Sequence, residues 1–301
     1  KQKTAYEMLR SLVGSEMCIR DSIIIKNGWV VQSINFRKFL PVGQLNIVVE
    51  YFNQWGIDEI VILDIDATRE GRSPNFDMIK SASSFSQTPL SVGGGIKSIK
   101  DMESLLRAGA DKLVINTQLI NNISLIEEGS HLFGNQCMVA SIDAIKVGNS
   151  YEVFNAYQDC ANLTVEKLAI DCENQGAGEI FLNSVDRDGM KLGLDIRLGQ
   201  IVRDSLSIPL ILCGGVGKSS DLVEGVRNGF DAVAAANFFH FTEMSVIAAK
   251  EFILRSGCNI RFDSFATYSG ANFDKFLDRP TRLSEVDLEK LRFEYIPEEF
   301  I

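Results

Sequence analysis

The stretch PLSVGGGI at residues 89–96 returns later in the chain as PLILCGGV at residues 209–216. The two copies lie about 120 residues apart, and the same register matches RAGAD at 107–111 with RNGFD at 227–231. A period this long exceeds that of solenoid repeats, so it indicates two fused half-domains. Each half carries one glycine-rich loop of the kind that binds phosphate. The repeat therefore predicts a ligand with a phosphate at both ends.

Short apolar runs alternate with helical patterns in both halves, which is typical of a parallel sheet covered by helices. Segments 98–108 and 219–228 have serine near the start, apolar residues three and four apart and a glycine just beyond, which are helix start and stop signals. The runs predict eight strands, at 23–25, 59–64, 90–92, 112–115, 138–143, 179–183, 210–213 and 232–235. Eight such units predict one α/β domain, a (β/α)8 TIM barrel with a two-fold half-barrel repeat and its functional residues on the loops after the strands.

The composition fits one large core and excludes several functions. The 301 residues are 46% hydrophobic and carry a net charge of −10, which is unsuited to a nucleic-acid surface. No apolar run approaches a membrane span, and the six cysteines show no C-x-x-C pairing, so we expect reduced thiols in a cytoplasmic protein. His131 and His240 are the only histidines, and neither has metal-ligand spacing. We expect no metal and no cofactor.

The two ends of the chain differ from the barrel pattern. The run LVGSEMCIRD at 12–21 reads like a translated sequencing-library adapter, so residues 1–22 are interpreted as an artefactual or disordered segment. The barrel is expected over residues 23–262 and an acidic C-terminal extension over 263–301. Residues 283–293 of that extension have the apolar spacing of a docked helix or a partner-binding tail.

Eight short motifs occur in order at barrel spacing. They are KNG at 26–28, LDIDAT at 63–68, GGGI at 93–96, INT at 115–117, SIDA at 141–144, DRDG at 186–189, GGVG at 214–217 and FHF at 239–241. Together they resemble the cyclase subunit of imidazole glycerol phosphate synthase, the HisF family, over nearly all of residues 23–262. The runs at 62–76 and 93–97 look closer to its WbuZ-like paralogue branch. The resemblance implies a lyase subunit of histidine biosynthesis that receives ammonia from a HisH-like glutaminase and cyclises a phosphorylated nucleotide.

The resemblance also implies two phosphate anchors at the barrel mouth. Its first anchor corresponds to Gly94, Gly95, Asn116 and Thr117, and its second to Asp188, Gly189, Gly214, Gly215 and Asn237. Glycines suit this role because they let backbone N–H groups approach phosphate oxygens closely. Asn237 and Asn183 stand where the family usually has serine and threonine, which keeps hydrogen-bonding capacity but changes the size of the pocket.

The family uses two aspartates as general acid and base, at the ends of the first and fifth strands. Asp143 matches the second aspartate, whereas Ile24 stands at the place of the first and cannot transfer a proton. The salt-bridged gate through which ammonia enters the barrel is matched at three positions, Glu59, Lys112 and Glu179. Its fourth member, an arginine at the start of the first strand, would fall within the displaced N-terminal segment. Asp111 lies where the family contacts its glutaminase.

An intact ammonia route beside a broken acid/base pair favours one function and leaves two others open. The first hypothesis is a barrel that passes ammonia from a glutaminase to an enzyme that amidates a sugar for surface polysaccharides. The second is an active histidine-pathway cyclase, with Asp64 or Asp66 replacing the missing carboxylate. The third is a structural activator of the glutaminase that conducts no ammonia.

Overall fold

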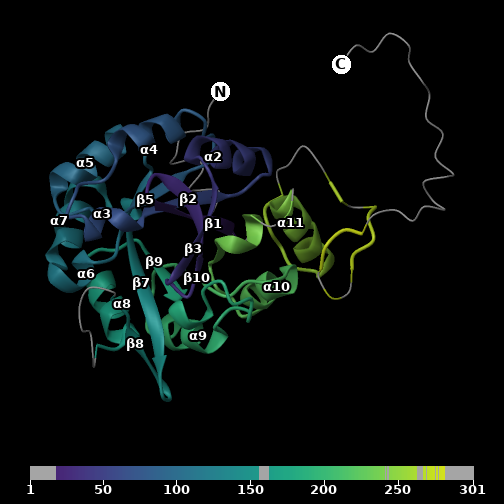
Figure 1. Cartoon of the computed structure of the whole chain (residues 1–301). Coiled ribbons are helices and arrows are strands. Elements are labelled where there is room, and N and C mark those ends of the chain that lie inside the picture. The colour runs from purple at the N-terminus through teal and green to yellow at the C-terminus, as the bar shows by residue number, and fades with distance from the viewer. Residues whose placement is uncertain are drawn as a thin grey trace, which may run out of the picture.

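The computed structural model of the chain describes residues 18–281, apart from 156–162, 241, 243, 263–266, 269, 275 and 277. The segments 1–17 and 282–301, with the helical pattern at 283–293, lie outside the described residues. Eight parallel strands close into a ring in the order β1-β4-β5-β6-β7-β9-β10-β11, with β11 pairing back onto β1. Helices surround this ring (Figure 1). The predicted (β/α)8 barrel is confirmed.

All eight barrel strands overlap the predicted ones, and the predicted helices at 98–108 and 219–228 are confirmed as α5 and α10. The barrel strands are β1 (Cys18–Lys26), β4 (Glu59–Asp64), β5 (Leu90–Gly93), β6 (Lys112–Ile115), β7 (Met138–Val147), β9 (Glu179–Ser184), β10 (Leu210–Cys213) and β11 (Ala232–Ala235). The helices are α2 (Leu45–Gln54), α3 (Ile65–Arg69), α4 (Phe76–Ser83), α5 (Ile99–Arg107), α6 (Gln118–Asn121), α7 (Ser124–Phe133), α8 (Val165–Asn174), α9 (Ile196–Arg203), α10 (Ser219–Arg227) and α11 (Ser245–Arg255). None of the described helices is long and apolar enough to cross a membrane.

Three further strands, which the sequence pattern did not predict, extend the sheet beyond the barrel mouth. β2 (Trp29–Ile34) and β3 (Lys38–Gly43) form an antiparallel hairpin on β1, and β8 (Ser150–Val153) folds back on β7. Asn27 and Gly28 both have positive φ in the turn between β1 and β2. An Asn-Gly pair is a strong hairpin signal because a tight hairpin turn needs left-handed backbone at both positions.

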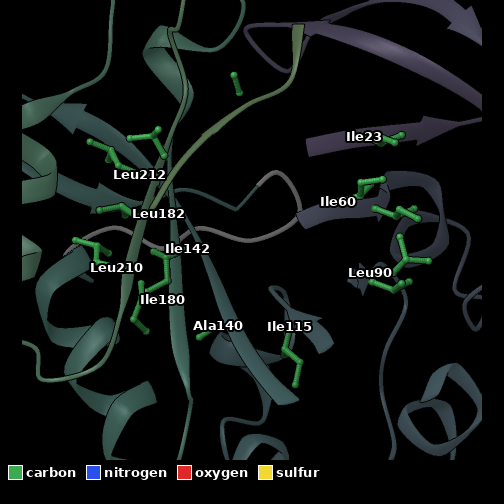
Figure 2. Packing of buried hydrophobic residues seen from close by; sticks show 14 of the residues in the cluster. Ile23, Ile60, Leu90, Ile115, Ala140, Ile142, Ile180, Leu182, Leu210 and Leu212 are labelled. Atoms are coloured by element: carbon green, nitrogen blue, oxygen red, sulfur yellow. The ribbon is translucent and has the colours of Figure 1, made fainter. Parts of the chain in front are cut away.

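Side chains of the barrel strands form two apolar layers, one on each face of the ring. The larger layer lies between the strands and the helices, and Figure 2 shows part of it, with Ile23, Ile60, Leu90, Ile142 and Leu212 from five different strands. A smaller cluster fills the barrel interior. Because successive side chains of a strand point to opposite faces, each strand contributes to both layers.

Residues at equivalent positions of the two sequence repeats make equivalent hydrogen bonds and packing contacts. The carboxylate of Asp111 accepts a hydrogen bond from the backbone N–H of Leu90 at 2.9 Å, and in the second half Asp231 accepts one from Leu210 at 3.0 Å. Gly94 and Gly214 both have positive φ, of 107° and 99°. Both pack so closely on the end of the preceding strand that a Cβ would collide with a backbone carbonyl oxygen. Each half therefore needs glycine at this position.

β1 begins at Cys18, so residues 18–22 belong to the barrel and the boundary expected at residue 23 lies five residues too late. The reason is closure of the ring. Residues 18–21 pair with β11, and residues from Arg20 onward pair with β4. A strand that began at residue 23 would leave β11 without its neighbour on one side.

The described part of the C-terminal extension packs against α10 and α11 (Figure 1). The carboxylate of Asp278 accepts a hydrogen bond from the backbone N–H of Ser220 at 3.0 Å, in the first turn of α10. On α11, Arg255 donates to the carbonyl oxygen of Ala271 at 2.7 Å and lies over the ring of Phe273. This part of the extension is thus a docked segment of the barrel.

Asp21 of β1 is an ionisable residue that lies buried in an apolar layer. It shares the outward face with Ile19 and Ile23 and is fully buried there. Neither carboxylate oxygen has a hydrogen-bond partner among the described residues. Burial therefore raises the pKa of Asp21 well above its ordinary value.

Replacing Asp21 with valine should stabilise the protein by about 1–3 kcal/mol at pH 7, because an unsatisfied buried polar group is removed. The folded state holds a proton that the unfolded chain releases above its ordinary pKa, so this residue lowers stability as the pH rises. Urea unfolding at pH 4.5 and pH 7 measures the effect. The gain of Asp21→Val should be larger at pH 7, whereas Asp204→Val at an exposed site should change little. Equal gains at both pH values would contradict this account.

Candidate active site at the barrel mouth

A cavity of about 380 Å³ opens at the carboxyl ends of the barrel strands. Its lining comes from both halves of the repeat and from the β2–β3 hairpin. Ile24, Asn116, Asp143 and Asn183 line its strand ends. Phe36 and Phe154 meet edge to face at its rim, with ring centroids 6.0 Å apart. The cavity lies where TIM barrels carry their active sites.

Asp143, the predicted catalytic residue, is held by two asparagine side chains. The Nδ2 of Asn116 donates to one carboxylate oxygen at 3.0 Å, and the Nδ2 of Asn183 donates to the other at 3.2 Å. Burial raises the pKa of Asp143 to about 6, against these two hydrogen bonds, which favour the charged form. A carboxyl group with this pKa can take or give a proton near neutral pH.

Ile24 lines the same cavity from the opposite wall. In the closed ring β1 and β7 are four strands apart in either direction, so Ile24 and Asp143 come from opposite strands. Ile24 is almost fully buried and pairs with Leu63 on β4 and Val31 on β2. The structure thus brings together the two strand ends that the sequence singled out, with one carboxylate between them.

The predicted first anchor is only partly in the cavity. Gly94, Asn116 and Thr117 line it. Gly95 instead packs beneath the loop after α3, where a Cβ would lie 2.7 Å from the carbonyl oxygen of Arg72. Its N–H group remains a predicted phosphate ligand.

The residues predicted for the second anchor line a separate, smaller cavity of about 20 Å³. They are Asp188, Gly189, Gly214, Gly215 and Asn237. Two of these residues also fasten the β2–β3 hairpin. Asp188 accepts a hydrogen bond from the Oγ of Ser33 at 2.6 Å, and Asn237 pairs with both backbone groups of Ser33, accepting at 3.1 Å and donating at 2.5 Å. The hairpin is therefore fastened to the loops that follow β9 and β11.

The three predicted gate residues meet at the opposite end of the barrel, where the strands begin. Lys112 Nζ lies 2.9 Å from Glu59 and 2.6 Å from Glu179. Arg20 completes the network, at 3.1 Å from Glu59 and 2.7 Å from Glu179. Burial opposes ionisation of Glu179, but Arg20 and Lys112 outweigh it and hold its pKa at about 2. The four charges balance, which a buried ionic cluster requires.

Asp111, the predicted glutaminase contact, lies beside this network at the start of β6 and is partly exposed. Burial raises its pKa, although its hydrogen bond from the Leu90 N–H opposes the rise. Between the base and the mouth, the interior is lined mostly by apolar side chains. They are Cys18, Val61, Leu63, Val114, Val139, Phe181, Ile211, Cys213, Ala232 and Ala234.

Comparison with known proteins agrees with this geometry. The profile of the family described as "Histidine biosynthesis protein" matches residues 19–245. The chain belongs to this family. It is 42% identical over 261 residues to a protein of Vibrio vulnificus named hisF2 after the imidazole glycerol phosphate synthase subunit, covering 86% of this chain and 95% of that protein.

Two further relatives place the chain in the HisF family. The imidazole glycerol phosphate synthase subunit HisF of Bacillus cereus is 41% identical over 242 residues, which cover 79% of this chain and 95% of the relative. A Campylobacter jejuni protein, also named hisF2 after that subunit, is 38% identical over 242 residues, which cover 79% of this chain and 96% of the relative. The chain is therefore a HisF-like barrel, as its motifs predicted.

Sequence reasoning missed several residues of the mouth and base. Arg20 was set aside because it falls in the run interpreted as adapter, although its two-residue spacing from Ser22 and Ile24 puts it on the inward face of β1. Ser33 and Phe36 were missed because the hairpin was not predicted. The Asn-Gly pair at 27–28 was the available signal for that hairpin.

The pKa of Asp143 gives a direct test of the site. Asn116→Leu or Asn183→Leu should each move that pKa further upward, because each removes a donor that stabilises the carboxylate while keeping the site dry. The pH dependence of the ¹³C carboxyl shift of Asp143 measures this. Thr117→Val, which removes a hydroxyl that does not contact Asp143, is the matched control. A lowered pKa in either asparagine variant would show that these amides do not set the charge of Asp143.

Proposed function

We propose that this protein is the ammonia-receiving barrel of a glutamine-amidotransferase complex and that it delivers ammonia for amidation of a sugar in surface-polysaccharide biosynthesis. One observation carries the proposal. A complete charged network at the base stands below a mouth that holds Asp143 opposite Ile24. A barrel that cyclised the family's substrate would need a proton-transfer group on both of these strands.

The proposed partner is a HisH-like glutaminase that docks on the base of the barrel. Asp111 and the charged network of Glu59, Lys112 and Glu179 would face it. The names of the relatives support this partner, since they refer to one subunit of a synthase. The apolar interior above the base supports passage of neutral ammonia, because an apolar lining admits an uncharged molecule at far lower cost than an ammonium ion.

The predicted anchor residues are proposed to hold a phosphorylated ligand at the mouth. Asn183 and Asp143 would contact the part of the ligand between the anchors. The remaining members are Gly94, Gly95, Asn116 and Thr117 on the first side and Asp188, Gly189, Gly214, Gly215 and Asn237 on the second. Asp143 is then retained for binding or for residual proton transfer.

An active cyclase of histidine biosynthesis is the second candidate, favoured by the pKa of Asp143 and by the 41% identity to the Bacillus cereus subunit. Its weakness is that, among the described residues, the other carboxylates lining the cavity are engaged, including Asp188 with Ser33. Asp64 is bound by Arg72 at 2.7 and 2.9 Å, and Asp66 is bound by Lys26 at 3.1 Å and by the N–H of Asn27. Both aspartates order the loop after β4.

Ammonia transfer can be tested with the barrel, a glutaminase and an amidating enzyme from the same gene cluster. An enzyme that consumes free ammonia is added to the assay. With the unsubstituted chain the rate of glutamine-dependent amidation should stay almost unchanged, because the ammonia does not pass through bulk solvent. Lys112→Met should make the amidation sensitive to that enzyme, because it leaves two carboxylates beside one cation at the base. Lys250→Met is the matched control, since Lys250 is equally buried and paired with Asp58 at 2.7 Å but lies on α11, outside the barrel interior.

The outcomes separate the three hypotheses. Amidation that depends fully on bulk ammonia, together with a stimulated glutaminase, would favour the structural activator. Cyclisation of the family's phosphorylated nucleotide with supplied ammonia would favour the histidine-pathway enzyme.

The broken acid/base pair leads to a separate prediction. The natural chain should show little cyclase turnover with supplied ammonia, and Ile24→Asp should raise the rate by about 10²-fold or more, because it restores a proton-transfer group opposite Asp143. Steady-state kinetics measure this, with Ile24→Asn as a polar control that transfers no proton. Robust turnover by the natural chain would return the protein to histidine biosynthesis.

A further inference from the structure

The two halves of the barrel mouth can be compared residue by residue, because the repeat register holds through the loops. A shift of about 120 residues carries Gly94 onto Gly214 and Thr117 onto Asn237. The same shift carries Arg69, at the end of α3, onto Gly189. We call the residues of the two predicted phosphate anchors the first and the second cradle. At this position the first cradle carries an arginine side chain and the second cradle carries none.

Glycine at position 189 is required by the hairpin, because β2 packs directly against this residue. Gly189 has a φ of 68°, and a Cβ there would collide with the carbonyl oxygen of Ser33. Ser33 is fixed in that place by its hydrogen bonds to Asp188 and Asn237. The second cradle therefore has no room for a side chain at position 189, and the cavity that its residues line is small, about 20 Å³.

The first cradle is built differently, and most of its residues line the larger cavity. Thr68, Arg69, Gly94, Asn116 and Thr117 all line the 380 Å³ cavity. The Arg69 side chain is exposed at its rim. This cavity, which Ser33 and Asp188 also line, gives the first cradle space beside it for a ligand group larger than a single phosphate.

Arg69 is also the cation of the cavity lining that has no ionic partner among the described residues. Lys26, the other cation in the lining, is paired with Asp66, and the nearby Arg72 is paired with Asp64 and Glu70. Within the described part of the chain, Arg69 makes no ion pair or hydrogen bond. A guanidinium group donates two parallel hydrogen bonds to phosphoryl oxygens and carries a full positive charge, which the uncharged backbone N–H groups lack.

We infer that Arg69 makes the first cradle specific for an extended anion, a diphosphate ester, while the second cradle accepts at most a single phosphoryl group. The ligand is then asymmetric, with its larger negative charge beside α3. This inference rests on the proposed function, because it specifies the phosphorylated ligand that the barrel mouth is proposed to hold.

Inorganic pyrophosphate and inorganic phosphate are the probes for the test, titrated calorimetrically into the full chain. The natural protein should bind pyrophosphate more tightly than phosphate. Arg69→Gln should weaken pyrophosphate binding about tenfold, or about 1.4 kcal/mol, and phosphate binding less. Arg69→Lys should recover only part of the loss, because an ammonium group lacks the planar fork. Arg107→Gln on α5, an exposed arginine paired with Glu103, is the matched control.

Equal pyrophosphate affinity in Arg69→Gln and the natural chain would overturn the inference, and so would a natural chain without preference for pyrophosphate. Thermal unfolding of each variant checks that the barrel is intact. The titration contains neither glutaminase nor ammonia, so its result is independent of ammonia transfer. A barrel that binds pyrophosphate through Arg69 but fails to transfer ammonia would refute the proposed function alone.

Discussion

Closure of the parallel ring by β1 is the constraint on which the rest of the structure depends. β1 pairs with β4 along one edge and with β11 along the other, and every other barrel strand keeps its place because this ring is complete. A closed eight-strand ring makes inward side chains converge from opposite walls. Ile24 therefore faces the wall that carries Asp143, and Arg20 reaches Glu179 at the base although the two are far apart in sequence.

The same strand shows how differently a buried charge behaves on the two faces of the ring. Arg20 points inward, where two glutamates and a lysine complete a balanced cluster. Asp21, the next residue, points outward into an apolar layer that offers no partner among the described residues. Desolvation is costly at both positions, but only Arg20 recovers the cost through ion pairs. Because successive side chains point to opposite faces of the strand, Arg20 stabilises the barrel and the adjacent Asp21 does not.

The barrel mouth repeats its glycine loops in both halves but differs in the segments around them. The β2–β3 hairpin follows the first strand and is fastened through Ser33 to Asp188 and Asn237 of the second half. In the first half α3 follows β4, and Gly94, Asn116 and Thr117 line the large cavity. The two sides of the mouth are therefore unlike, although the glycine loops repeat.

The sequence by itself determined the order of the eight barrel strands, the repeat, the glycine loops and the place of Asp143. These features follow from local patterns, because apolar runs, caps and glycines act on the backbone within a few residues. It could not determine that β1 starts at Cys18, that Arg20 joins the charged network at the base, or that Asn237 binds Ser33 of the hairpin. Each of these depends on residues that meet only when the ring closes, such as Arg20 with Glu179 or Ser33 with Asn237. Contacts between such distant residues leave no periodic trace in a single chain, so only the tertiary structure decides them.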